Sequence, residues 1–189
     1  MRYLGSLIVI LSACVVVLYS CAKWKDPKGY TDPKLTNPYC NDPNAVNYNW
    51  GFPGKPDSTV CFYPDALFKG IYLFHDSVYS VTSGLFIGAD SFYLTIHSLS
   101  KTQISVFGIC PSAADSVLLT AGPTFVATVD TMIGDSLTTE GQSLCILADT
   151  INGTMTKDRI DSPAVIHVNF QVATDSGTFI HSGSAIIQP

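Results

Sequence analysis

Hydrophobic and polar residues alternate along the C-terminal two thirds of this 189-residue chain. In the two clearest runs the hydrophobic phase consists of Phe92, Leu94, Ile96, Ile166, Val168 and Phe170. A period of two is typical of a strand with one buried face. Shorter strand candidates lie at residues 70–75, 77–82, 103–109, 115–120, 124–130, 144–148, 150–156 and 177–187. No long window after residue 21 has helical periodicity, so we predict an all-β fold for residues 65–189.

Turn-forming Gly, Asp, Ser and Thr separate the strand candidates at intervals of roughly 8–12 residues, which is typical of antiparallel sheets. The architecture is then a small antiparallel barrel or, alternatively, a two-sheet β-sandwich. In a barrel the hydrophobic phase would face inward, where eight strands leave space for side chains or one small ligand. We expect these residues mainly to fill a core, with a bound ligand as the alternative.

The N-terminus decides the expected compartment. Arg2 is followed by a nearly unbroken apolar stretch at residues 4–19, which is typical of a secretory signal. A membrane-spanning helix is the alternative. The stretch ends in Leu18-Tyr19-Ser20-Cys21, which resembles the lipobox of bacterial lipoproteins. The resemblance implies that residues 1–20 are an N-terminal signal helix that is removed, and that Cys21 carries palmitate or other acyl chains in the cell envelope.

Residues 21–39 then form a lipid-anchored tether. Four lysines, three prolines and no apolar periodicity predict an extended spacer, either solvated or lying on anionic head groups. We expect attachment to the outer membrane, and the sequence leaves open whether the protein faces the periplasm or the cell surface. The membrane, reached through the N-terminal lipid, is therefore one expected partner.

Residues 40–64 carry a Cys, Asp-Pro, Ala and Asn-Tyr pattern that ends in Ser58-Thr59-Val60-Cys61. This resembles a short module of Bacteroidetes-type secreted proteins and lipoproteins. We expect Cys40 and Cys61 to pair in an oxidising compartment, which closes the loop and stabilises it by roughly 3 kcal/mol. A calcium site built from the Asp and Asn oxygens is a weaker alternative, because only two carboxylates are available.

The C-terminal body resembles a lipocalin-like domain of the same lipoproteins, most of which are uncharacterised. The resemblance rests on Phe68-Lys69-Gly70-Ile71-Tyr72, a turn at Asp76, and Ile151-Asn152-Gly153-Thr154 before a long hairpin. It implies a small antiparallel barrel. Cys110 and Cys145 depart from that pattern, and we predict that they form a second disulfide.

The composition argues against nucleic-acid binding and points to candidate O-glycosylation sites. The net charge of −5 excludes nucleic acid as a partner, because phosphate binding needs a basic face. Nine of the fourteen Asp residues precede Ser or Thr, and six of these sites resemble the O-glycosylation acceptor of Bacteroidetes periplasmic proteins. The acceptor residues are Ser58, Ser77, Ser116, Thr131, Ser136 and Thr150. Ordinary turn chemistry followed by a strand explains the same pattern equally well.

No catalytic motif is recognisable in the chain. The four histidines lie outside any nucleophile-elbow or zinc-protease context. A zinc site built from His97, His167 and His181 is a weak alternative to solvated histidines, so we predict no metal, no cofactor and no enzyme. We expect a non-catalytic module that binds a ligand or a protein partner. The alternatives are an accessory subunit of an outer-membrane assembly and, less favoured, a hydrolase with dispersed catalytic residues.

Overall fold

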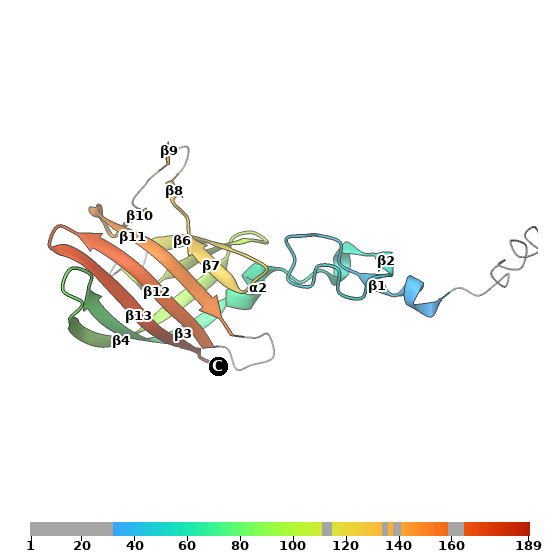
Figure 1. Cartoon of the computed structure of the whole chain (residues 1–189), viewed down its shortest axis with the longest axis horizontal. Coiled ribbons are helices and arrows are strands. Elements are labelled where there is room, and N and C mark those ends of the chain that lie inside the picture. Colours follow the sequence, from blue (N-terminus) through green and yellow to red (C-terminus); the bar gives the residue numbers. More distant parts are fainter. Residues whose placement is uncertain (1–31, 111–114, 134–135, 138–140, 159–164) are drawn as a thin grey trace, which may run out of the picture.

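The computed structural model describes residues 32–110, 115–133, 136–137, 141–158 and 165–189 (Figure 1). The predicted signal at residues 1–20, the lipidation site Cys21 and the first part of the tether lie outside the described residues. Within the described residues, no helix has the length and apolarity that crossing a membrane requires.

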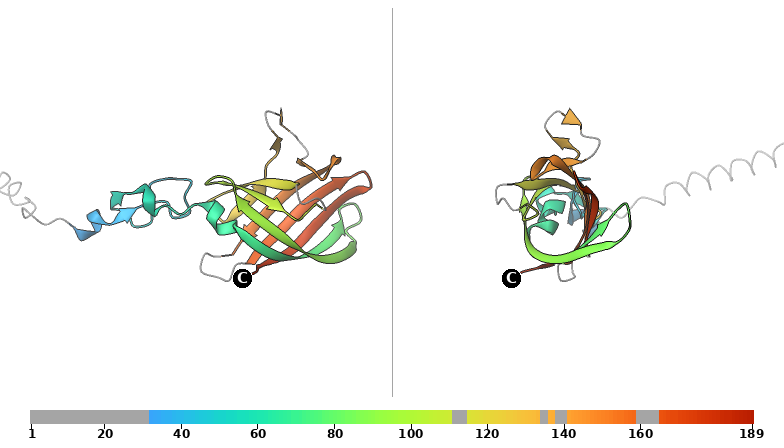
Figure 2. Two further views of the ribbon diagram at one scale, coloured as in Figure 1. Left: turned by 180° about the vertical axis from the view of Figure 1, so that it is seen from behind. Right: turned by 90° about the vertical axis from the view of Figure 1, so that its left-hand side faces the viewer.

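Eight strands form the body. They are β3 (Gly70–Ser80), β4 (Phe86–Ser98), β5 (Gln103–Phe107), β6 (Ser116–Ala121), β7 (Val126–Val129), β11 (Ile146–Lys157), β12 (Val165–Thr174) and β13 (Gly177–Ile187). Each strand pairs antiparallel with the next in this order, and β13 pairs with β3 to close the ring. The view along the axis shows the closed ring (Figure 2). The prediction of a small antiparallel barrel is confirmed, and the sandwich alternative is wrong.

Three short strands lie between β7 and β11. These are β8 (Met132–Ile133), β9 (Ser136–Leu137) and β10 (Gln142–Leu144). Strand β8 pairs with β9, and β10 pairs with the first part of β11 through a register shift. The segment is therefore an insertion in an otherwise simple up-and-down meander.

The inward phase of the strands makes the core, as the alternation of the sequence predicts. Leu94, Ile96, Ile166, Val168 and Phe170 are at most 2% exposed. Phe92 is partly buried and packs against the same cluster. Burial of apolar side chains contributes roughly 25 cal/mol per Å², which makes this interior the main source of stability.

Two strand boundaries differ from the prediction. The sequence pattern predicts separate strands at 70–75 and 77–82 with a turn at Asp76, whereas β3 runs unbroken through that residue and the chain reverses only after Ser80. Strand β11 likewise spans the predicted break near residue 149. Asp-Ser and Asp-Thr pairs favour turns locally, but here the pairing of each strand with both neighbours keeps the backbone extended.

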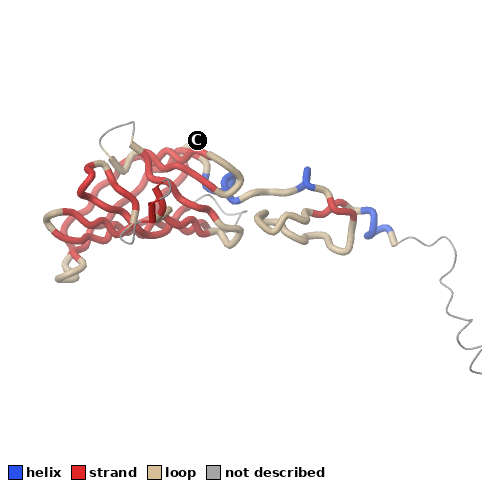
Figure 3. Tube along the Cα trace, turned by 90° about the horizontal axis from the view of Figure 1, so that it is seen from above, coloured by secondary structure: helices blue, strands red, loops and turns tan. Residues whose placement is uncertain are grey.

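Helix α2 (Pro64–Phe68) closes one end of the barrel (Figure 3). It is too short for a periodic signal, and proline at its first turn starts it. Its Leu67 and Phe68 are buried. Beneath it the Lys157 ammonium donates to the Leu67 carbonyl and lies 5.9 Å from the centre of the Tyr72 ring. Burial lowers the pKa of Lys157 and raises the pKa of Tyr72 to about 12.

The segment before α2 is a separate small unit, the disulfide module (residues 32–63). It holds the helical turns η1 (Pro33–Thr36) and η2 (Ser58–Val60) and the parallel strands β1 (Pro38–Tyr39) and β2 (Lys55–Pro56). Cys40 and Cys61 form the predicted disulfide. The module extends away from the α2 end of the barrel (Figure 1).

Polar side chains of the module satisfy its own backbone. Asn47 donates to the Val60 carbonyl and accepts from the Phe62 amide, and Asp57 caps η2. Asp42 accepts from Asn44 and from the Tyr63 hydroxyl. These contacts engage the oxygens of the calcium alternative in turns and caps, as the disulfide-pinned interpretation predicts.

Candidate functional site

The barrel encloses a cavity of about 180 Å³. Its walls are apolar except for one histidine, and the lining residues are Phe74, Phe92, Leu94, Ile109, Leu144, Ile151, Phe170, Val172 and His181. The residues come from the middle of the barrel and from the end opposite α2, which we call the far end. At the α2 end the helix and the buried Tyr72 fill the interior instead.

Strand alternation positions this lining. Phe92 and Leu94 are two residues apart on β4, and Phe170 and Val172 are two apart on β12, so each pair projects from one face of its strand. Phe74 on β3 is the Cα partner of Phe92, and their rings meet edge to face with centroids 5.4 Å apart. The aromatic wall is therefore set by register across neighbouring strands.

A buried acid lies beside this wall. Asp76 is on the same face of β3 as Phe74, two residues farther along, and is 3% exposed. Its Oδ2 atom lies 2.6 Å from Nδ1 of His181 on β13. A carboxylate only accepts hydrogen bonds, so the Nδ1–H of His181 donates. The His181 side chain lines the cavity yet stays 31% exposed, so solvent reaches the cavity along that side.

A glycine brings the two strands close at this point. Gly183 on β13 is the Cα partner of Asp76, and a Cβ atom added there would overlap the carbonyl oxygen of His75. The missing side chain lets the backbone of β3 approach β13 directly opposite Asp76. Asp76 consequently reaches along the sheet to His181, the next residue on the inward face of β13.

The second oxygen of Asp76 has no partner among the described residues. Oδ1 is buried and accepts no hydrogen bond within the described part of the chain. A buried polar atom that lacks a partner costs roughly 1–3 kcal/mol, and more if it is charged. Native proteins contain few such atoms, so a hydrogen-bond donor is expected at Oδ1.

Charge is divided between the two ends of the barrel. Acids of the middle and far end are Asp76, Asp90, Asp115, Asp149 and Asp175. Among the described barrel residues the bases are Lys69, Lys101 and Lys157, and all three lie at the α2 end. Asp90 is the Cα partner of Asp76 on β4, so the two carboxylates share one face of the sheet.

A disulfide holds the loops at the far end. Cys110 and Cys145 are bonded, as predicted. Each directly follows a residue that lines the cavity, Ile109 and Leu144 respectively. The bond joins the end of β5 to the segment between β10 and β11. The bond thereby holds Ile109, just after β5, and Leu144, at the end of β10, in the cavity wall.

The structure separates the three histidines of the zinc alternative. His97 and His167 are exposed on the outward phase of β4 and β12, whereas His181 faces inward. Within the described residues no three His, Cys, Asp or Glu side chains are grouped to hold a metal ion. The weak alternative of a zinc site at these three histidines is therefore wrong, because His97 and His167 point out of the barrel and His181 points into it.

The six acceptor candidates for O-glycan lie in different settings. Ser58 and Thr131 are exposed. Ser77, Ser116 and Thr150 are half-buried within strands, and Ser136 lies in β9. Glycosylation at any of them stays a prediction.

Sequence reasoning missed the importance of Asp76. Its Asp-Ser-Val context was interpreted as a turn and an acceptor site, and His181 was considered only as a metal ligand. The available signal was phase, since Asp76 follows Tyr72 and Phe74 at intervals of two, which places it on the buried face.

Comparison with known proteins gives one distant likeness. No family model and no curated protein matches the sequence. A crystal structure of a protein of unknown function from Bacteroides ovatus aligns with a TM-score of 0.38 and 9% identity. The alignment covers 64% of this chain and 42% of that chain, so this chain spans less than half of its length.

Proposed function

We propose that the protein is a cell-envelope lipoprotein whose barrel binds one small apolar ligand. The observation that carries the proposal is the partly open cavity of about 180 Å³ with its aromatic wall. Concave apolar sites with a few polar groups are the usual form of small-molecule sites. His181 supplies the polar group of this lining, and the buried Asp76 accepts its hydrogen bond.

The volume of the cavity limits the size of the ligand. Drug-sized ligands occupy pockets of about 300–1,000 Å³, whereas a cavity of about 150 Å³ lined by Leu, Ile and Phe binds benzene. The present cavity is close to the smaller figure. It therefore accepts an apolar group of about one six-membered ring or a short branched chain, and it is too small for a long acyl chain.

The envelope location is supported by the N-terminal sequence and by the disulfides. The apolar stretch before Cys21 resembles a lipoprotein signal, and both predicted disulfides form. Disulfides persist in oxidising compartments outside the cytoplasm. The intact mass of the protein from its host tests the anchor: we expect the mass of the chain from residue 21 plus acyl groups. A mass that includes residues 1–20 without acyl groups contradicts it.

The test of cavity binding uses toluene as the probe and the full chain in detergent micelles, with micelles alone as the blank. We expect saturable binding in ligand-observed NMR. Val172→Phe, which fills the cavity from β12, should abolish binding. Gln171→Phe adds the same ring to the exposed face of that strand and should leave binding unchanged. Absence of toluene binding, or equal loss in both variants, contradicts the proposal.

A second candidate is an accessory role in an outer-membrane assembly. The β3–β4 hairpin at the far end exposes Leu85, Phe86 and Ile87 by 65%, 57% and 57%. Contiguous exposed apolar side chains are typical of protein contacts. This role predicts that the wild-type protein, extracted from its host membrane, elutes as a larger particle than the variant Phe86→Ser.

Catalysis is not the function that the site favours. An Asp–His pair can serve as a general base, but among the described residues no Ser, Thr or Cys is hydrogen-bonded to His181. The expectation that the protein is not an enzyme stays a prediction.

A further inference from the structure

We propose that the ligand of the cavity is a small organic cation: a primary amine whose ammonium group donates to Asp76 and whose apolar part fills the aromatic pocket. This inference rests on the proposed binding function and adds the charge of the ligand to it. Three features of the far half of the barrel carry it.

The first feature is the free oxygen of Asp76. Oδ2 is engaged by His181, while Oδ1 is buried with no partner in the described chain. Asp76 faces the barrel interior from the strand that also carries Phe74, and its partner His181 lines the cavity. A ligand N–H donor at this place satisfies the atom, and a charged donor forms the stronger, charge-assisted bond.

The second feature is the charge around the site. Asp90, an exposed residue of β4, is the Cα partner of Asp76. If His181 is protonated, this trio still carries a net charge of −1, and if His181 is neutral it carries −2. All described bases of the barrel lie at the other end, beside α2. A carboxylate or phosphate ligand would therefore meet a site of net negative charge, whereas an ammonium group meets a complementary field.

The third feature is the wall itself. Phe74, Phe92 and Phe170 surround the apolar space. Aromatic faces attract ammonium groups, and this attraction is largest where water is excluded. The same rings pack against a six-membered ring or a branched alkyl group, so one wall accommodates both parts of the amine.

The test compares three ligands of one shape and different charge: benzylamine, benzyl alcohol and benzoate. Affinities are measured by calorimetry at neutral pH on the full chain in detergent micelles, with a micelle blank. We expect benzylamine to bind at least about tenfold more tightly than benzyl alcohol, and benzoate to bind more weakly than either. This comparison on the wild-type chain does not depend on the folding of a variant.

Two variants then locate the charge. Asp76→Asn keeps an acceptor for His181 and removes the negative charge, so benzylamine affinity should fall at least about tenfold while benzyl alcohol stays within about twofold. Asp175→Asn removes one charge from the exposed β12–β13 turn and is the matched control. It should change benzylamine affinity by less than about twofold.

The outcomes distinguish this inference from the binding function itself. Equal affinities for benzylamine and benzyl alcohol, or equal effects of the two Asp variants, overturn the cationic ligand and leave apolar binding intact. Failure of toluene, benzylamine and benzyl alcohol to bind overturns both proposals.

Discussion

Gly183 sets the spacing of two strands at the residue that matters most for the site. It faces Asp76 across β3 and β13, where a larger residue would collide with the His75 carbonyl. Backbone atoms cannot move aside as a flexible side chain does. The position is thus a strong test of whether this close approach exists.

Replacing Gly183 by Ala should destabilise the barrel by about 3 kcal/mol, because the new methyl group forces the strands apart. Gly88→Ala on β4 is the matched control, since nothing lies within 4 Å of a Cβ atom there. That change should stay within about 0.5 kcal/mol. Urea unfolding followed by circular dichroism measures both, and similar losses for the two variants would argue against the strand spacing described.

For single residues, the alternation of the sequence predicts which side chains are buried but not which side chains contact each other across the barrel. The alternation on β4 and β12 identified Leu94, Ile166 and Phe170 as inward residues, because period two is a local property of the sequence. The contact between Asp76 and His181 joins residues 105 positions apart. It depends on β13 closing the ring against β3, which no local pattern contains.

At the scale of elements, the far-end disulfide connects loops that carry cavity residues. The two cysteines are 35 residues apart, and closing a loop of this length stabilises the barrel by roughly 3–4 kcal/mol in the chain-entropy model. We expect Cys110→Ser with Cys145→Ser to lower toluene affinity as well, because Ile109 and Leu144 lose their fixed positions.

The bond between Cys40 and Cys61 provides the control for this prediction. Cys40→Ser with Cys61→Ser removes a bond in the disulfide module, away from the cavity. It should leave toluene affinity unchanged. The two double variants are compared by the same NMR titration. An equal loss of toluene affinity in both would show that the far-end disulfide has no specific effect on the cavity.

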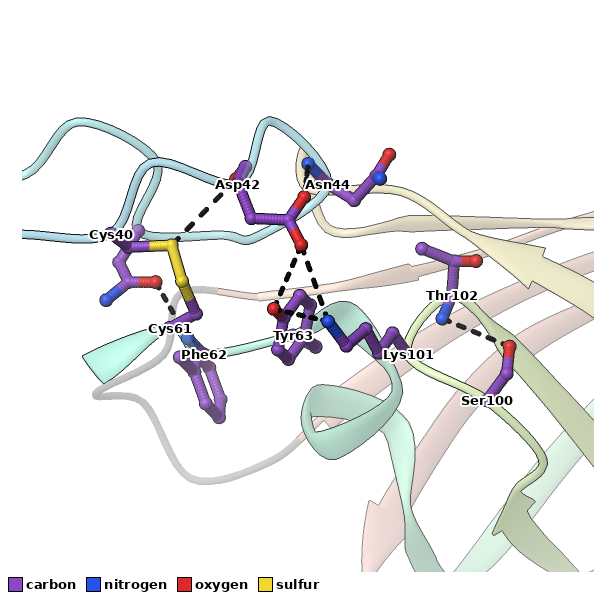
Figure 4. A network of polar contacts seen from close by, with 10 residues as sticks. Cys40, Asp42, Asn44, Cys61, Phe62, Tyr63, Ser100, Lys101 and Thr102 are labelled. Carbon is purple, nitrogen blue, oxygen red and sulfur yellow. Dashed lines mark hydrogen bonds and ion pairs between the residues drawn. A yellow bond between two sulfur atoms is a disulfide. The ribbon is translucent and has the colours of Figure 1, made fainter. Parts of the chain in front are cut away.

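The disulfide module meets the barrel through a small polar network (Figure 4). The Lys101 ammonium lies 2.7 Å from the Tyr63 hydroxyl and 3.5 Å from Oδ2 of Asp42. Hydrogen bonds from the Asn44 amide and then from Tyr63, with the nearby Lys101 charge, lower the pKa of Asp42 below its usual 3.8. The ionised form of Asp42 is thus favoured in the folded protein.

This shift predicts a pH dependence of defined sign. Because the folded-state pKa is lowered, the stabilisation is present above pH 3.8 and is lost as the pH falls through the lowered value. Wild type should therefore unfold at a slightly higher temperature than Asp42→Asn at about pH 6, and the difference should vanish at about pH 2. A difference that persists at the lower pH, measured by thermal unfolding, is inconsistent with this contact.

Element boundaries were the least predictable part of the fold. The sequence pattern divides β3 at Asp76 and β11 near Asp149, because Asp followed by Ser or Thr favours turns. Helix α2, with five residues, has too few positions to show a period. The antiparallel direction and the presence of the other strands are easier to predict, since turn residues separate them and each carries its own alternation.

In the whole molecule the cavity lies away from the disulfide module. The disulfide module leaves the barrel at the α2 end (Figure 1), where Tyr72 is buried and Lys157 is half-buried. The cavity and the acids belong to the middle and the far end. An anchored protein would thereby direct the acidic, ligand-binding end away from the lipid.

A crystal structure of the full chain with benzylamine tests the central claim most directly. We predict that the ring lies among Phe74, Phe92 and Phe170, with the ammonium nitrogen within hydrogen-bond distance of Oδ1 of Asp76. Benzylamine bound only outside the barrel, with those three rings packed against one another, would contradict the account.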